Sequence, residues 1–504
     1  SWQKAEYAGT YLYADKITQN DSYYNMWGQY YKGIRKCNTI FTRIDECKDL
    51  KGLDRREIMG LTHFMRASFY FYLLELYDEC VEYICKDLEE AYSLLDPTRP
   101  STQFERPTKY AAAALMSRVR LYQASKWYNG NQYYADWTTS DGRNMIAQQY
   151  DPVKWAKSAA ASKRIIDSGI YSLYTVPSDE NTYASSQASQ AEFPLGVGGI
   201  DPYHSYIDMF NGEALAVKNP ELIYATPLNN NIISIAFPLK LGGWNGLGIT
   251  QKLIDAYYMK DGEDYVQQPD YYEEAGTVPT IATGYELRPT VAKMYLDREP
   301  RFYASIGFCE CFWPATSVTG TEAPNVTNFT AGYYVNGNCA KQAANPEDYN
   351  LTGYTLKKYI HPEDNCTSHT GAKIKPKTFP VFRYAEILLN YVEALNELKG
   401  EPEYTEAADN TTYHVLYNPE EIMYYFNMIR YRAGLPGITL ADAADQVKMR
   451  QLIIRERMIE FACEGRRYHD LRRWGLAETE ENKPVQGMDV TKKTTERDQF
   501  YTVV

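Results

Sequence analysis

The densest group of charged side chains lies near the end of the chain. Residues 455–474 (RERMIEFACEGRRYHDLRRW) combine arginines, glutamates, an aspartate and one histidine, the residue types that carry protons in acid–base catalysis. Their spacing instead favours a packed helix. Apolar or small residues recur at steps of three, four and seven at Val447, Ile454, Met458, Phe461, Gly465, Tyr468 and Leu471. We therefore expect His469 to be structural and the charges to form exposed or scaffold ion pairs, such as Arg466 with Asp470.

The chain carries none of the compact motifs of common enzyme classes. G-x-S-x-G, H-E-x-x-H, a P-loop and a complete G-x-G-x-x-G are all missing from the sequence. A glycosidase needs only two carboxylates roughly 5 to 10 Å apart, and 65 acidic residues offer many pairs. We expect no enzyme, with a glycoside hydrolase as the least favoured alternative.

Metal and cofactor sites are not indicated. His204 and Asp208 lie four residues apart and would share a helix face, but without a third ligand a structural role is favoured. No EF-hand-like spacing supports a structural calcium ion. The nine cysteines are scattered without C-x-x-C spacing, so they indicate neither a zinc site nor a disulfide framework. No cofactor and no metal are expected.

The net charge and the hydropathy of the chain argue against a nucleic-acid-binding protein and against a membrane-spanning helix. The net charge is -12 and the pI about 5.2, so a nucleic-acid backbone would be repelled. No apolar run approaches the roughly 18 to 20 residues that span a bilayer. The first residues lack the charged and apolar regions of a secretory signal, so the compartment cannot be read from them directly.

Tyrosine is the unusual residue in the composition. The chain has 47 tyrosines, and aromatic residues make up 14% of it. A tyrosine or tryptophan ring offers a flat apolar face with a polar edge, which suits amphipathic ligands such as sugars. A pyranose can stack its C–H face on such a ring while its hydroxyls bond to nearby polar side chains.

The candidate ligand contacts are aromatic or amide residues in polar, loop-like surroundings. They form three clusters: Trp2, Tyr7, Tyr11 and Tyr13; Trp244 and Asn245; and Trp313, Tyr333, Tyr334 and Asn336. A turn around Trp244 cannot bury both members of its pair. A fourth aromatic group is expected to pack rather than to bind, and it comprises Trp127, Tyr128, Tyr133, Tyr134 and Trp137.

Helical patterns occupy both ends of the chain. Helices are predicted over 27–44, 55–77, 87–95, 107–122, 152–168, 383–398, 419–433 and 441–474. Small residues alternate with apolar ones in several of them, as stacked helical hairpins of tetratricopeptide type require. We expect a single, mainly α domain over 1–504. Its parts are an N-terminal helical part (1–170), a loop-rich region with short strands (171–378), a C-terminal helical part (379–478) and an extended tail (479–504).

Six segments, in order along the chain, resemble the SusD/RagB family, surface glycan-binding lipoproteins of Bacteroidetes outer membranes. They are residues 27–38 (WGQYYKGIRKCN), 64–77 (FMRASFYFYLLELY), 124–131 (ASKWYNGN), 298–303 (REPRFY), 382–394 (FRYAEILLNYVEA) and 464–474 (EGRRYHDLRRW). The resemblance implies about four tetratricopeptide-like helix pairs packed on a loop-rich half that carries the ligand contacts. The last segment thereby becomes a family signature.

The same resemblance implies a function. Such a protein captures oligosaccharide or polysaccharide at the cell surface and delivers it to a SusC-like TonB-dependent transporter, without catalysis. It would sit on the outer membrane through an N-terminal lipid anchor that the printed sequence does not contain. A peptide-capturing protein of the RagB branch is the alternative. One segment departs from the family: residues 78–80 lead almost directly into the next helix, where relatives carry a longer loop.

Overall fold

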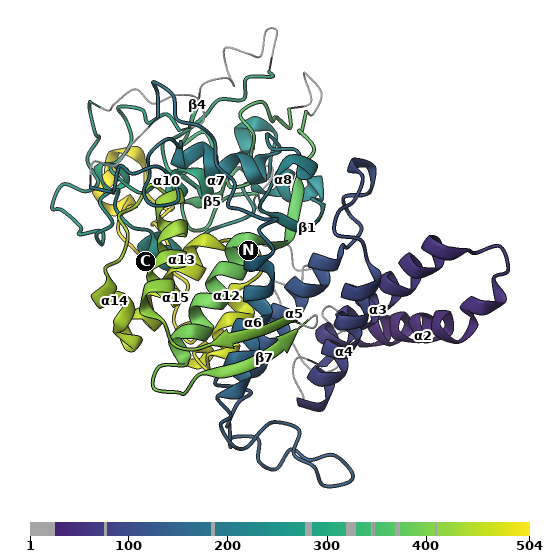
Figure 1. Ribbon diagram of the computed structural model, residues 1–504. Coiled ribbons are helices and arrows are strands. Elements are labelled where there is room, and N and C mark those ends of the chain that lie inside the picture. The colour runs from purple at the N-terminus through teal and green to yellow at the C-terminus, as the bar shows by residue number, and fades with distance from the viewer. Residues whose placement is uncertain are drawn as a thin grey trace.

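The protein consists of a helical part and a loop-rich part that pack against each other (Figure 1). The computed structural model describes residues 26–74, 78–182, 187–277, 285–318, 329–343, 346, 348–367, 373–408 and 411–504. The candidate ligand contacts Trp2, Tyr7, Tyr11 and Tyr13 lie outside these residues. Each part has its own hydrophobic core.

The helical part stacks its helices in series. Each packs on the next in the order α2, α3, α4, α5, α6, α12 and α13, and α15 also lies on α12. The prediction of helical hairpins is therefore confirmed. The helices are α2 (Trp27–Arg43), α3 (Gly52–Leu74), α4 (Asp78–Leu94), α5 (Lys109–Ala124), α6 (Val153–Asp167), α12 (Tyr384–Glu397), α13 (Pro419–Arg432) and α15 (Gln446–Glu460).

Small side chains let α5 and α6 approach closely. The alanines 111–114 of α5 are buried, and Ser117 Oγ lies 2.8 Å from Ser162 Oγ of α6. The start of α5 differs from the prediction. Pro107 precedes the helix, and Thr108 caps it, with its hydroxyl accepting a hydrogen bond from the amide of Ala111. A threonine cap satisfies an amide that the first helical turn leaves unpaired.

The loop-rich part contains short helices and two-stranded antiparallel pairs. Its helices are α7 (Pro202–Asn211), α8 (Asn230–Ala236), α9 (Gln251–Ala256) and α10 (Pro300–Ser305). Its pairs are β1 (Leu222–Pro227) with β6 (Thr378–Arg383), β2 (Ile306–Phe308) with β5 (Tyr354–Leu356), and β3 (Cys311–Trp313) with β4 (Phe329–Ala331). A hairpin of β7 (Tyr404–Ala408) and β8 (Thr411–Val415) covers α6.

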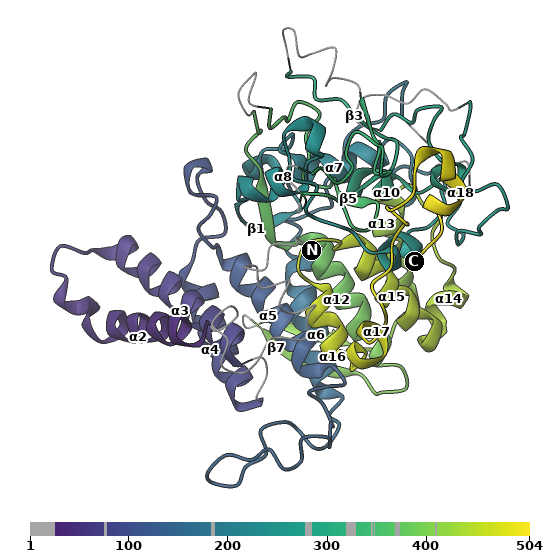
Figure 2. The ribbon, with the colours of Figure 1, turned by 180° about the vertical axis from the view of Figure 1, so that it is seen from behind.

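The prediction of one helix over 441–474 is wrong. The chain forms α14 (Leu440–Ala444), α15 and α16 (Arg467–Arg473), and α16 lies beside α12 (Figure 2). Cys463 (φ +60°) and Gly465 (φ +75°) adopt left-handed backbone, which a right-handed helix cannot contain. The proposed apolar stripe also fails, because Val447 and Tyr468 are exposed.

The C-terminal segment is more structured than an extended tail. It contains α17 (Ala477–Glu481) and α18 (Arg497–Phe500), and Met488, Phe500 and Tyr501 are buried in the core of the loop-rich part. All nine cysteines are free thiols. Within the described ranges, no helix is both long and apolar enough to cross a membrane.

Candidate functional site

A cavity of about 310 Å³ lies in the loop-rich part, and it combines aromatic walls with charged and amide groups. One wall is a face of α7, and the opposite walls come from the ends of β3 and β5 and the residues that follow them. The lining residues are Tyr203, His204, Ile207, Asp208, Asn211, Glu213, Trp313, Pro314, Lys357, Ile360, His361 and Pro362.

Both ends of α7 are fixed by local sequence. The Asp201 carboxylate accepts hydrogen bonds from the amides of Tyr203 (2.9 Å) and His204 (3.0 Å), and Pro202 occupies the first turn. Gly212 ends the helix with φ +95°, the left-handed backbone that glycine adopts without strain. The intervening ten residues place positions 203, 204, 207, 208 and 211 on one face.

Asp208 organises the polar groups along α7. Its Oδ1 lies 3.3 Å from His204 Nδ1 and accepts a hydrogen bond of 3.3 Å from the Asn211 amide. The hydrogen bond to Asp208 raises the pKa of His204, against the opposing effect of burial. This wall therefore offers a carboxylate, an amide and an imidazole within about two turns of helix.

A second polar group faces the cavity from the loop after β5. His361 Nδ1 accepts a hydrogen bond from the amide of Glu363 (3.1 Å), so its proton lies on Nε2, 2.9 Å from a Glu213 carboxylate oxygen. Lys375 also pairs with Glu213. Lys375 first, and then His361, lower the pKa of this carboxyl group. Glu213 is therefore an ionised acceptor held at the rim.

Trp313 supplies an aromatic wall. Its side chain is 1% exposed, and its ring centroid lies 5.7 Å from that of Phe237. The indole Nε1 is buried without a hydrogen-bond partner within the described part of the chain. Lys357 lies nearby, where its ammonium group donates to the carbonyl of Tyr303 (3.2 Å) and burial lowers its pKa.

This combination suits a polyhydroxylated ligand. Carboxylate, amide and imidazole groups pair with hydroxyls, while the buried Trp313 and Ile360 side chains form apolar lining. Within the residues that the structure describes, no group of three or more His, Cys, Asp and Glu side chains could hold a metal ion. His204 and Asp208, considered as a metal pair from the sequence, bond to each other instead.

The structure separates the predicted pair Trp244 and Asn245. Trp244 is 38% exposed, whereas Asn245 is buried. The Asn245 side chain accepts from the amide of Leu239 (2.9 Å) and donates to the carbonyl of Cys339 (3.1 Å). Asn245 thus holds the turn that presents Trp244.

The third predicted cluster does not form one surface. Tyr333 and Tyr334 are buried, and the Tyr334 ring centroid lies 4.2 Å from that of Phe500. Asn336 is exposed but donates to the Thr494 hydroxyl (3.1 Å). The sequence predicts that these residues lie open in a loop. The C-terminal segment instead packs against Tyr334 and Asn336. Trp313 is brought to the cavity described above.

Most of the cavity-lining residues were not predicted from the sequence. Asn211, Glu213 and His361 were not among the candidates, although the Asp201-Pro202 start and Gly212 stop mark the short helix that carries one wall. The other wall depends on pairing between β2 and β5, which are far apart in the sequence. No local pattern indicates that pairing.

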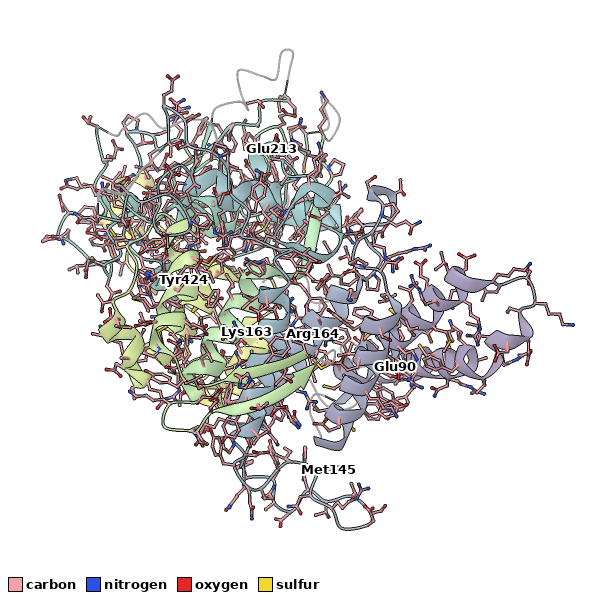
Figure 3. The ribbon with its side chains drawn as sticks, in the orientation of Figure 1. Glu90, Met145, Lys163, Arg164, Glu213 and Tyr424 are labelled. Atoms are coloured by element: carbon pink, nitrogen blue, oxygen red, sulfur yellow. The ribbon has the colours of Figure 1, made fainter. Side chains whose placement is uncertain are left out.

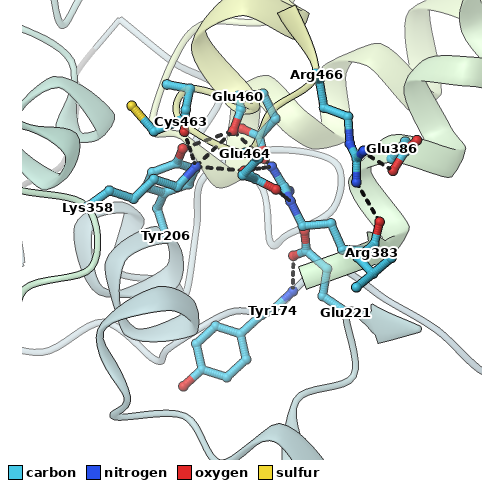
Figure 4. Close-up of polar contacts among 12 residues, drawn as sticks. Tyr174, Tyr206, Glu221, Lys358, Arg383, Glu386, Glu460, Cys463, Glu464 and Arg466 are labelled. Carbon is cyan, nitrogen blue, oxygen red and sulfur yellow. Dashed lines mark hydrogen bonds and ion pairs between the residues drawn. The ribbon is translucent and has the colours of Figure 1, made fainter. Parts of the chain in front are cut away.

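The charges of the closing segment form a buried structural network, not a catalytic site (Figure 4). Arg383 binds Glu460 (2.7 Å), Glu464 (2.8 Å) and Glu221 (2.7 Å) at the boundary between the two parts. Although burial disfavours the charged guanidinium, Glu464, Glu460 and Glu221 raise the pKa of Arg383 well above its usual value. Lys358 adds a further bond to Glu464 (2.7 Å).

The predicted pair of Arg466 with Asp470 is replaced by other pairs. Arg466 lies 3.7 Å from Glu386, and Asp470 binds Arg457 (3.0 Å) and Arg473 (2.8 Å), all of them buried or nearly so. Arg466 and Asp470 keep the i, i+4 spacing of a helix, because the Asp470 amide donates to the Arg466 carbonyl (3.0 Å), but their side chains bind other partners. Burial raises the pKa of the Asp470 carboxyl, but Arg457 and Arg473 outweigh it and lower the pKa to about 2.

Comparison with known families gives the class of protein. The sequence model of the SusD family matches residues 224–503, more than half of the chain. A second model, described as starch-binding associating with outer membrane, matches residues 1–78. The chain therefore belongs to the SusD family.

Solved structures share the fold over almost the whole chain. A SusD-like protein from Bacteroides fragilis NCTC 9343 is 25% identical, with a TM-score of 0.65 over 94% of this chain and 79% of that chain. A SusD-like carbohydrate binding protein from the same strain is 19% identical, with a TM-score of 0.63 over 94% and 77%. A SusD superfamily protein from Bacteroides vulgatus ATCC 8482 is 16% identical, with a TM-score of 0.54 over 95% and 80%. No curated protein matches the sequence.

Proposed function

We propose that this protein captures oligosaccharide at the cell surface and delivers it to a partner TonB-dependent outer-membrane transporter, with no catalysis of its own. The observation that carries the proposal is the SusD family match over residues 224–503, which includes two of the three cavity walls. A family description that names starch binding and the outer membrane supports the ligand class and the location. Lipid anchoring belongs to the same proposal.

The cavity supports a neutral or weakly charged glycan. Its walls carry both signs of charge, and Glu213 and Asp208 are already paired with cationic or imidazole groups. These paired charged groups favour the neutral hydroxyls of a sugar. A strongly charged ligand would meet a charge of its own sign for each opposite charge that it binds. Trp244, on a turn of the same loop-rich part, is proposed as an additional stacking residue.

Affinity electrophoresis in gels containing amylopectin, laminarin, xylan or glucomannan tests the proposal. The parent protein is expected to be retained by one of these polysaccharides. His204→Ala and Trp244→Ala are expected to weaken that retention. His414→Ala and Trp27→Ala are matched controls, because both residues are exposed and lie in the helical part.

Two other outcomes would replace the proposal. Calorimetric heat with a mixture of oligopeptides, and none with glycans, would support the peptide-binding alternative. New reducing ends after prolonged incubation with the retained polysaccharide would indicate a hydrolase. Equal retention of His204→Ala, Trp244→Ala and the two controls would refute the site assignment while leaving glycan binding in place.

A further inference from the structure

A second aromatic region lies at the opposite end of the molecule from the cavity. It belongs to the long connection between α5 and α6, residues 125–152, which projects from the helical part. Figure 3 shows Met145 of this connection near the bottom of the molecule and Glu213 of the first cavity in its upper part. We name residues 125–152 the projecting loop.

Exposed rings are stacked on the projecting loop. Tyr133 is 79% exposed and Trp137 is 50% exposed. The ring centroids of Tyr134 and Trp137 lie 4.5 Å apart with an interplanar angle of 29°, and Tyr133 meets Tyr134 edge-on at 4.9 Å. The expectation that this group packs inside the protein therefore holds for only part of it. Two rings keep wide faces open to solvent.

Hydrogen bonds hold the backbone that carries these rings. The Trp137 amide donates to the carbonyl of Tyr134 (3.0 Å), and the Met145 amide donates to the carbonyl of Trp137 (2.9 Å). At the base of the loop, Asn129 donates to the carbonyl of Asp151 (2.9 Å) and accepts from its amide (2.8 Å). A ring held in advance loses little conformational entropy when a ligand binds.

A cavity of about 410 Å³ lies at the base of the projecting loop. The Trp127 ring contacts the Tyr133 and Tyr134 rings, and the Trp127 amide donates to the carbonyl of Arg473 (3.0 Å), which precedes the cavity-lining Trp474. Tyr150, Trp155 and Trp474 line the cavity. Trp127 therefore lies between the aromatic cavity and the exposed rings.

Polar groups on this cavity are fixed. Glu393 accepts from the Trp474 indole (2.8 Å), and Glu397 binds Arg450 through two contacts of 2.7 Å. The core of a protein–protein interface is depleted of charged residues, whereas sugar hydroxyls pair well with carboxylate and guanidinium groups. The combination of open rings and fixed charges therefore favours carbohydrate over a protein partner.

We infer that the projecting loop and its adjoining cavity form a second carbohydrate-binding site, which contacts polysaccharide chains independently of the first cavity. This inference rests on the proposed glycan-binding function and extends it. A long polysaccharide engages both sites, and the second contact is then made at high effective concentration. A short oligosaccharide occupies each site separately.

Gel retention of the full chain tests the second site. The variant Tyr133→Ala/Trp137→Ala removes the two open faces, and Trp27→Ala/Tyr31→Ala is its control, an exposed pair with ring centroids 5.0 Å apart on α2. With the polysaccharide that retains the parent, we expect about tenfold weaker binding for the first variant and no change for the control. Calorimetry with a hexasaccharide of the same polysaccharide should fall from two sites per chain to one.

Hydrogen exchange provides a readout that does not depend on a variant. The retained polysaccharide should protect backbone amides between residues 127 and 150 of the parent. Unchanged retention of Tyr133→Ala/Trp137→Ala, or exchange there that the polysaccharide does not slow, would refute the second site alone. A parent that no polysaccharide retains would overturn the proposed function, and the second site with it.

Discussion

Removing the guanidinium of Arg383 should destabilise the protein strongly. The substitution Arg383→Met keeps much of the side-chain volume but deletes bonds to Glu221, Glu460 and Glu464 at 2.7–2.8 Å. These carboxylates are nearly inaccessible to solvent. Breaking a buried ion pair by removing one partner leaves an uncompensated charge, which costs about 3–5 kcal/mol.

The charge balance of the network explains why so large an effect is expected. Five cations face five carboxylates in and around it: Arg301, Lys358, Arg383, Arg430 and Arg432 against Glu221, Glu299, Glu456, Glu460 and Glu464. The variant leaves one carboxylate in excess in a site that water does not reach. Burial raises the pKa of Glu460, but Arg432 and Arg301, which the variant keeps, still lower it and oppose protonation.

Thermal unfolding measures the cost. An unfolding entropy of about 2.1 cal/mol/K per residue, for 504 residues, amounts to about 1.1 kcal/mol/K. A loss of about 3–5 kcal/mol then lowers the Tm by about 3–5 °C. The control Arg143→Met removes an exposed ion pair with Asp141 and should cost less than about 1 kcal/mol. If the two variants melt within about 1 °C of each other, the network does not stabilise the boundary between the two parts.

Three further predictions concern pH, the end of α7 and the cap of α5. Burial raises the pKa of Glu386, but Arg118 outweighs it and lowers the pKa to about 2, below its ordinary 4.5. This contribution to stability is therefore complete above about pH 4.5 and lost as the pH falls toward 2, and a Tm that stays constant over that range would contradict it. Gly212→Ala should lower the Tm and weaken glycan retention, because a Cβ there would lie 2.5 Å from the Pro376 carbonyl, whereas Gly169→Ala, also on left-handed backbone (φ +64°), meets no atom within 4 Å and should spare retention. Thr108→Ala should cost about 1 kcal/mol by circular-dichroism melting, and an unchanged melting curve would show that the cap contributes nothing.

Much of the helical part could be predicted from the sequence, because long amphipathic periods and capping residues are local signals. The predicted boundaries 152–168 and 419–433 agree with α6 and α13 to within one residue at each end. The break after Glu460 was missed because Gly465 fits an apolar stripe as a small residue. Its left-handed backbone is a consequence of tertiary packing that periodicity does not report.

The ligand-contact residues were harder to predict for a related reason. Every residue of β3 is buried, so Trp313 does not follow the alternation that marks a half-exposed strand. Tyr333 and Tyr334 lie in a polar sequence, yet both are buried, and Phe500 and Tyr501 pack against the Tyr334 ring. Which side chains are exposed in the loop-rich part depends on which distant segment of the chain packs over them. The amino-acid composition does not indicate that packing.

The buried ion network also has a consequence for the order in which this chain can fold. Glu221, Glu299, Arg301, Lys358 and Arg383 leave the ribosome well before their partners at 456–464. Until those last residues emerge, Arg301 and Arg383 can pair only with Glu299 and Glu221, and Lys358 lacks Glu464. These cations must then stay partly hydrated, which keeps the boundary between the two parts open. The loop-rich part therefore completes its fold only after synthesis is almost finished, so a nascent chain stalled before residue 456 should remain sensitive to protease throughout that part.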